Sequence, residues 1–178
     1  MEFQNEAQMT IHLSRILEND FLIREDKWGR SITDNKRVRI DLLLYPNNHL
    51  IEKGFDPGWI GIEVKHFTDK DGGGKAAETF WQAISYQQST YDIDSQQVRP
   101  FKVFIFTNFH DVNTDREDRK KAYHGMLLLS NYGHVGDIQL KKSGWVMRTS
   151  GSVYFLKKEG DYKRGPTNPF TNNTGNCS

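Results

Sequence analysis

Residues 59–67, with the sequence Trp-Ile-Gly-Ile-Glu-Val-Lys-His-Phe, place two charged side chains inside an otherwise apolar segment. The β-branched residues and the strict alternation predict a strand. Glu63 and Lys65 would project side by side, because neighbours on the same face of a strand are roughly 6.6–7 Å apart. A charged group is costly to bury without a partner or a metal. This strand is therefore a candidate for a functional site.

A second apolar strand is predicted at residues 38–45, and it carries Asp41 in its middle. If the two strands are neighbours, Asp41 and Glu63 bring two carboxylates to one point beside Lys65. Two carboxylates suit a hard divalent cation such as Mg²⁺. A lysine beside such a metal can orient or deprotonate a water molecule. The pattern predicts a metal-assisted hydrolytic site.

Length and composition limit the remaining possibilities. The chain has 178 residues, enough for one domain with a sizeable core. No apolar run approaches the ~20 residues that span a bilayer, and we expect neither a membrane segment nor a secretory signal. Cys177 is the single cysteine, which excludes an intramolecular disulfide and a cysteine-ligated zinc or iron–sulfur site. These features predict an intracellular protein.

The net charge of +1 hides an uneven distribution. Residues 1–138 hold 17 Lys and Arg against 21 Asp and Glu, whereas residues 139–178 hold 7 against 2. The basic C-terminal part could bind a polyanion, or its lysines could be ordinary solvated residues of a hairpin. The sequence leaves both interpretations open.

Hydrophobic periodicity predicts an alternation of helices and strands. The expected order is helix, three strands, helix, strand, at residues 5–19, 21–28, 38–45, 59–67, 75–91 and 101–107. A helix between two neighbouring strands favours a mixed sheet with a parallel crossover. Beyond it we expect a helix at 115–129 and then short strands at 137–142, 145–148 and 153–156.

The ordered motifs resemble those of the PD-(D/E)xK nuclease superfamily. Asp41 is followed, after 21 intervening residues, by Glu63-Val64-Lys65, and Gln82-x-x-x-Tyr86 lies on the next helix. The last spacing is similar to the Gln-x-x-x-Tyr motif of the RecB-like and lambda-exonuclease-like branch. One departure is Ile40, which stands where the proline of the motif name would precede the aspartate.

This resemblance implies an α/β fold with a restriction-endonuclease-like core of order αβββαβ, in which helices flank a mixed central sheet. The core would occupy about residues 5–107, and residues 108–164 would form a β-rich C-terminal extension of the same domain, 1–164. Residues 165–178, rich in Pro, Asn, Thr and Gly, are expected to form a disordered tail.

The resemblance also implies roles for individual residues. Asp41 and Glu63 would bind Mg²⁺ or Mn²⁺ together with the backbone carbonyl of Val64. A glutamate on the first helix, Glu6, could hold a second metal or a metal-bound water. Lys65 would position the attacking water.

On the second helix, Gln82 would help to order the site and Tyr86 would contact a phosphate. The implied reaction is hydrolysis of a phosphodiester in DNA, by a protein of phage or mobile-element type acting in a bacterium or an infected host cell. A structure-specific or restriction-like endonuclease is the first alternative. The second is a non-catalytic nucleic-acid-binding module that uses residues 139–164 and the aromatic residues Trp145, Tyr154 and Phe155. A homo-oligomer is compatible with each.

Overall fold

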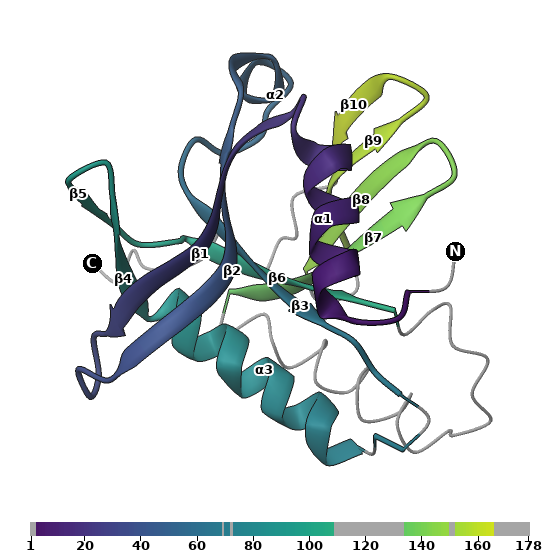
Figure 1. Ribbon diagram of the computed structural model, residues 1–178. Coiled ribbons are helices and arrows are strands. Elements are labelled where there is room, and N and C mark those ends of the chain that lie inside the picture. Colours follow the sequence, from purple (N-terminus) through teal and green to yellow (C-terminus); the bar gives the residue numbers. More distant parts are fainter. Residues whose placement is uncertain (1–2, 69, 72, 109–133, 150–151, 166–178) are drawn as a thin grey trace, which may run out of the picture.

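The computed structural model describes residues 3–68, 70–71, 73–108, 134–149 and 152–165. The described chain forms an α/β fold with one ten-stranded mixed sheet (Figure 1). Its helices are α1 (Glu6–Leu17), α2 (Asn48–Glu52) and α3 (Gly73–Gln87). Its strands are β1 (Phe21–Ser31), β2 (Arg37–Pro46), β3 (Ile60–Lys65), β4 (Ser89–Ile93), β5 (Gln96–Val98), β6 (Lys102–Thr107), β7 (Val135–Lys141), β8 (Gly144–Thr149), β9 (Ser152–Lys158) and β10 (Asp161–Arg164).

The strand order across the sheet is β10-β9-β8-β7-β6-β3-β2-β1-β4-β5. β1, β2 and β3 form an antiparallel meander, and β3 then pairs in parallel with β6 through the α3 crossover. β3 lies near the middle of the sheet, and five of its six residues are buried. This central position explains why its sequence is so apolar around Glu63 and Lys65.

Helix α1 covers one face of the sheet with the apolar stripe expected from its spacing. Its buried residues Met9, Leu13 and Leu17 belong to the largest core cluster, together with inward-facing leucines and isoleucines of β2 and β3. Asn5 caps the helix, because its side chain accepts a hydrogen bond from the backbone N–H of Gln8 at 3.0 Å.

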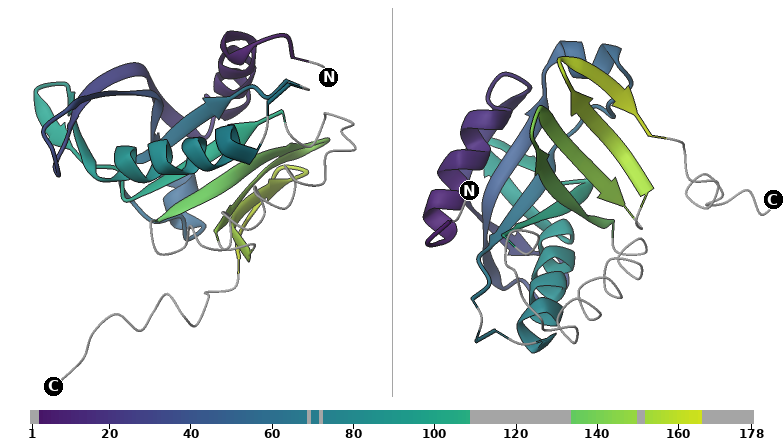
Figure 2. Two further views of the ribbon diagram at one scale, coloured as in Figure 1. Left: turned by 90° about the horizontal axis from the view of Figure 1, so that it is seen from below. Right: turned by 90° about the vertical axis from the view of Figure 1, so that its right-hand side faces the viewer.

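Helix α3 covers the opposite face (Figure 2). Ala76, Phe80 and Ala83 pack there against Val103 and Ile105 of β6. The side chains of Glu63 and Lys65 alternate with those that reach α1, so they lie on the α3 face of the sheet. Their setting is therefore the layer between the sheet and α3.

The helix expected at 75–91 ends at Gln87, and this part of the sequence analysis was wrong. Residues 89–93 form β4 instead, which pairs with the end of β1 through Gly29 and Tyr91. Tyr91 and Ile93 are buried in a third core cluster, so tertiary packing outweighs the local helical pattern. The short helix α2 and the strands β5 and β10 were also not expected.

Strands β7–β10 extend the sheet beyond β6, in keeping with the β-rich extension that was expected. The buried carboxylate of Asp20, immediately before β1, links them to the core. It accepts hydrogen bonds from Trp145 Nε1 at 2.9 Å, Tyr162 OH at 2.6 Å and Lys157 Nζ at 3.0 Å. His49 Nε2 lies 3.2 Å from the same carboxylate.

The aromatic residues of this extension pack in the hydrophobic core. Trp145 and Phe155 are fully buried, and Tyr154 is nearly so. None of the three offers a ring face on which a base could stack, which removes the aromatic part of the binding-module alternative. The helix expected at 115–129 and the tail from 166 onward lie outside the described residues. Within the described ranges, no helix combines the length and the apolar character that a membrane crossing requires.

Candidate active site

The candidate site begins where β2 and β3 stop pairing. Their pairing ends at Leu42 and Ile62, which are the chain neighbours of Asp41 and Glu63. Beyond this point the backbone N–H of Val64 donates a 2.7 Å hydrogen bond to Oδ2 of Asp41. The side chain of Asp41 thus replaces a strand-to-strand backbone partner. The fork that opens between the strands leaves room for polar side chains in the middle of the sheet.

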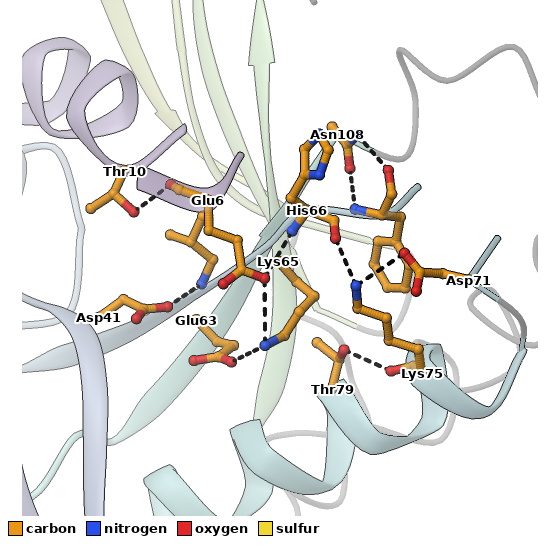
Figure 3. Close-up of polar contacts among 12 residues, drawn as sticks. Glu6, Thr10, Asp41, Glu63, Lys65, His66, Asp71, Lys75, Thr79 and Asn108 are labelled. Atoms are coloured by element: carbon orange, nitrogen blue, oxygen red, sulfur yellow. Dashed lines mark hydrogen bonds and ion pairs between the residues drawn. The ribbon is translucent and has the colours of Figure 1, made fainter. Parts of the chain in front are cut away.

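Glu63 and Lys65 lie in this fork, next to Asp41 (Figure 3). Lys65 Nζ is 3.3 Å from Glu63 Oε1, and the Glu63 side chain is only 4% exposed. The expectation that the two side chains project together from one strand is confirmed. Because Glu63 is buried and Lys65 is largely covered, this contact differs from a solvated surface ion pair.

Glu6 reaches the same place from the first turn of α1. Its Oε1 lies 3.7 Å from Lys65 Nζ and accepts a 3.2 Å hydrogen bond from the backbone N–H of His66. The ring of His66 contacts the backbone carbonyl of Phe3 at 2.9 Å, which ties the segment before α1 to the end of β3. The position of Glu6 is therefore fixed by two elements of the fold.

Helix α3 contributes Gln82 and Tyr86, one turn apart on the side that faces the sheet. Both side chains line a cavity of about 440 Å³ with Glu6, Asp41, Glu63 and Lys65. Oε1 of Gln82 is buried and, among the described residues, has no hydrogen-bond partner. A buried acceptor without a donor is costly, and such an atom aimed at a polar cavity is typical of a ligand-binding position.

Arg37 and Arg39 of β2 also line this cavity, and sequence reasoning did not select them. The signal was present in the alternation of β2, because Arg37, Arg39 and Asp41 are two residues apart and so share one face of the strand. A polyanion that approaches Asp41 along β2 would pass both guanidinium groups.

Burial and mutual repulsion shift the pKa values of the two central carboxyl groups, Asp41 and Glu63. Burial, reinforced by the neighbouring Asp41, raises the pKa of Glu63 to about 8. Burial also raises the pKa of Asp41, although the hydrogen bond from Val64 opposes this. Glu63 therefore holds a proton at neutral pH unless another cation replaces it. A strongly shifted acid of this kind in a cavity marks a candidate functional site.

Lys65 keeps its charge in this environment. Burial alone would lower its pKa, but the carboxylates of Glu63 and Glu6 outweigh that effect and raise the pKa above its ordinary value. Lys65 is therefore an ammonium that donates hydrogen bonds rather than a neutral amine that accepts a proton. Burial likewise raises the pKa of the Tyr86 phenol, which stays protonated and can donate a hydrogen bond.

The residues of the cavity fit a hard divalent cation by their chemistry. Asp41, Glu63 and Glu6 provide carboxylate oxygens, and the unpartnered Oε1 of Gln82 is a further oxygen. No ready-formed cluster of three or more His, Cys, Asp or Glu ligands is present among the residues that the structure describes. A metal would therefore displace the proton of Glu63 and draw the carboxylates together.

Comparison with known proteins adds no family assignment: no protein-family model matches the chain, and neither a curated protein nor a solved structure does.

Proposed function

We propose that this protein is a metal-dependent nuclease of the PD-(D/E)xK type that hydrolyses phosphodiester bonds in DNA. One observation carries the proposal. Glu6, Asp41, Glu63, Lys65, Gln82 and Tyr86 come from four separate elements and line one cavity. These are the positions that the Asp…Glu-x-Lys and Gln-x-x-x-Tyr patterns select.

The fold is compatible with a restriction-endonuclease-like core. β1, β2, β3 and β6 are adjacent in that order, with α1 on one face and α3 on the other. The fork between β2 and β3 is the feature that opens the sheet for chemistry. Strands β7–β10 and the β4–β5 hairpin would then be additions to this core.

In the proposed reaction Asp41 and Glu63 would hold Mg²⁺ or Mn²⁺, together with the backbone carbonyl of Val64. The metal supplies stabilisation of the charge that develops on the phosphate and on the leaving oxygen. Lys65, as an ammonium, orients the attacking water and stabilises negative charge. Glu6 would accept a hydrogen bond from a water molecule in the cavity, and the Tyr86 hydroxyl would donate one to a phosphate oxygen.

The test uses linear duplex, single-stranded and covalently closed circular DNA, each incubated with Mg²⁺, with Mn²⁺ and with EDTA. The informative variants are Asp41→Asn and Lys65→Ala. Matched controls on the exposed strand β10 are Asp161→Asn and Lys163→Ala, which make the same chemical changes away from the cavity.

Metal-dependent cleavage that disappears in both site variants and persists in both controls is the expected result. Cleavage of linear DNA alone would define an exonuclease, and nicking of closed circles an endonuclease. Cleavage that survives Asp41→Asn, or that needs no divalent metal, would contradict the proposal.

A further inference from the structure

The hairpin formed by β1 and β2 extends away from the body of the protein (Figures 1 and 2). One face of this hairpin carries basic and aromatic side chains. Trp28 pairs with Arg39 across the two strands, and Arg30 pairs with Arg37. Because alternate residues share a face, these four side chains lie on the same side of the hairpin. Asp41 follows Arg39 on that side.

Trp28 is an unusual residue for such a position, because its side chain is large and half exposed, with 49% of its surface accessible. The guanidinium carbon of Arg37 lies 3.8 Å from the centre of the indole ring. An arginine and a tryptophan held together in water offer a flat surface for stacking and a positive charge for a phosphate.

A second cavity of about 420 Å³ is lined by Trp28, Arg30 and Arg37, together with one carboxylate, Asp92. Arg37 lines this cavity and the candidate active site alike. The two cavities therefore adjoin at one arginine. A chain-like ligand could occupy both, with one part beside Trp28 and the next part beside Asp41 and Glu63.

The charges of the hairpin favour an anionic ligand. Arg37 has no ion-pair partner within the described ranges of the chain, and the residue is exposed. Arg39 faces Asp26 at 3.8 Å, but both side chains are more than half exposed, so this pair competes weakly with a bound phosphate. Phosphates bound to Arg37 and Arg39 would therefore lie along β2, in the direction of Asp41.

We infer that the Trp28, Arg37 and Arg39 face of the β1–β2 hairpin binds a single-stranded segment of nucleic acid and delivers it to the cavity at Asp41. A base stacks on the ring of Trp28, which requires a base that is not already stacked inside a duplex. The guanidinium groups of Arg37 and Arg39 contact the flanking phosphates. This inference rests on the proposed function, because it names the form of the substrate that the same site receives.

The test measures binding without cleavage. Fluorescence anisotropy would be recorded with a labelled single-stranded DNA of 12 nucleotides and with the duplex of the same sequence. Both would be measured in EDTA at several salt concentrations. The variants are Trp28→Ala and Arg37→Ala. Trp81→Ala is the matched control, because Trp81 is equally a surface tryptophan, 65% exposed, on α3. Thermal unfolding of each variant verifies that it is folded.

We expect the wild-type protein to prefer the single strand. Trp28→Ala should weaken single-strand binding about 10-fold, within the ~5- to 150-fold that one base–aromatic stack contributes. Arg37→Ala should reduce the slope of log affinity against log salt by about 0.7, the value for one phosphate contact on a single strand. Trp81→Ala should bind as the wild type does.

Equal or tighter duplex binding that is unaffected by Trp28→Ala would overturn the inference, as would a wild-type protein that binds no single strand. The outcome is separable from that of the proposed function. Trp28-dependent binding by a protein that cleaves nothing would support the hairpin and reject the nuclease. Metal-dependent cleavage with unchanged rate and affinity in both hairpin variants would support the nuclease and reject the hairpin.

Discussion

The backbone N–H of Val64 donates a 2.7 Å hydrogen bond to the carboxylate of Asp41, at the position where β2 and β3 separate. One side chain therefore holds the fork between the strands and presents a negative charge to the cavity. The hydrogen bond needs only an oxygen acceptor, whereas a metal needs a negative charge. Burial and the nearby Glu6 penalise that charge. Substitutions at Asp41 can separate these two roles.

Asp41→Asn should abolish function while leaving the fold at least as stable. The amide oxygen of asparagine still accepts the hydrogen bond from Val64, and the penalised charge is gone. We expect cleavage to fall at least about 100-fold, the usual loss for one electrostatic contributor to catalysis. Asp41→Ala should in addition lower the free energy of unfolding by about 1–3 kcal/mol, because the Val64 N–H loses its acceptor. A lower melting temperature for Asp41→Asn than for Asp41→Ala would contradict this.

The stability of the metal-free protein should fall as pH rises from about 4.5 to about 8. Burial and Asp41 raise the pKa of Glu63 to about 8, from 4.5. In that window the folded state binds a proton that the unfolded state has lost, so each pH unit costs up to about 1.4 kcal/mol. Glu63→Gln should flatten the dependence of melting temperature on pH.

Divalent metal should counteract this loss, because it replaces the proton on Glu63. Addition of Mg²⁺ should therefore raise the melting temperature more at pH 8 than at pH 6. In Glu63→Gln the effect of Mg²⁺ should be small at both pH values. An equal effect of Mg²⁺ in the variant and the wild type would place the metal elsewhere.

Asp20→Ala should be among the most destabilising substitutions in this chain. Burial alone would raise the pKa of Asp20, but hydrogen bonds from Tyr162, Trp145 and other donors outweigh it and hold the pKa below its ordinary value. Removal of the carboxylate leaves the Lys157 ammonium without its ion-pair partner. We therefore expect the free energy of unfolding, measured in urea, to fall by about 3–5 kcal/mol.

The difference in stability between the wild type and Asp20→Ala should become smaller in acid, because the part that depends on the charge of Asp20 is lost. Because the folded pKa of Asp20 lies below the unfolded one, its contribution is present above pH 3.8 and is lost as pH falls through the folded pKa. The exposed Asp161→Ala should change stability by less than about 0.5 kcal/mol at any pH. A similar loss in both variants would show that charge, rather than the buried network, decides.

Two glycine substitutions should have opposite signs. A Cβ at Gly29 would overlap the carbonyl oxygen of Thr90 and the ring of Tyr91, so Gly29→Ala should destabilise by about 1–3 kcal/mol. A Cβ at Gly74, in α3, meets nothing within 4 Å. Gly74→Ala should stabilise by up to about 1 kcal/mol, because alanine favours the helix. Chemical denaturation measures both, and the same sign for the two would refute the packing argument.

Gln82→Met should leave the metal-free protein equally stable or slightly more so. The buried Oε1 of Gln82 has no partner among the described residues, and a thioether of similar size removes that cost. The rate of cleavage should nevertheless fall roughly 10- to 100-fold, as for residues that support metal ligands. A stability loss with unchanged cleavage would make Gln82 a structural residue.

The alternation of apolar and charged residues was enough to predict β2, β3 and the meeting of Asp41, Glu63 and Lys65. A pattern with a period of two fixes which side chains share a face, and two neighbouring strands then leave few arrangements. Periodicity likewise predicted the first helix, and the family resemblance selected Glu6 on it.

Features that depend on distant contacts were not predictable in the same way. The residues after Gln87 form a strand because Tyr91 fits beside Gly29, about 60 positions earlier in the chain. The proximity of Trp28 and Arg37 depends on the register of the β1–β2 hairpin. The local periodicity of the sequence predicts neither the strand β4 nor the register of the hairpin. The same holds for Asp20, whose donors Trp145, Lys157 and Tyr162 lie at the opposite end of the described chain.

The Asp20 network also sets an order of events during synthesis. Asp20 is separated from Trp145 by 125 positions and from Tyr162 by 142, so it belongs to the contacts of highest sequence separation in the fold. A ribosome that has released only α1 to β6 has exposed the Asp20 carboxylate before its partners Trp145, Lys157 and Tyr162 are made. Because chains emerge N-terminus first, strands β8 to β10 pair late in synthesis with a carboxylate that lies just before the first strand.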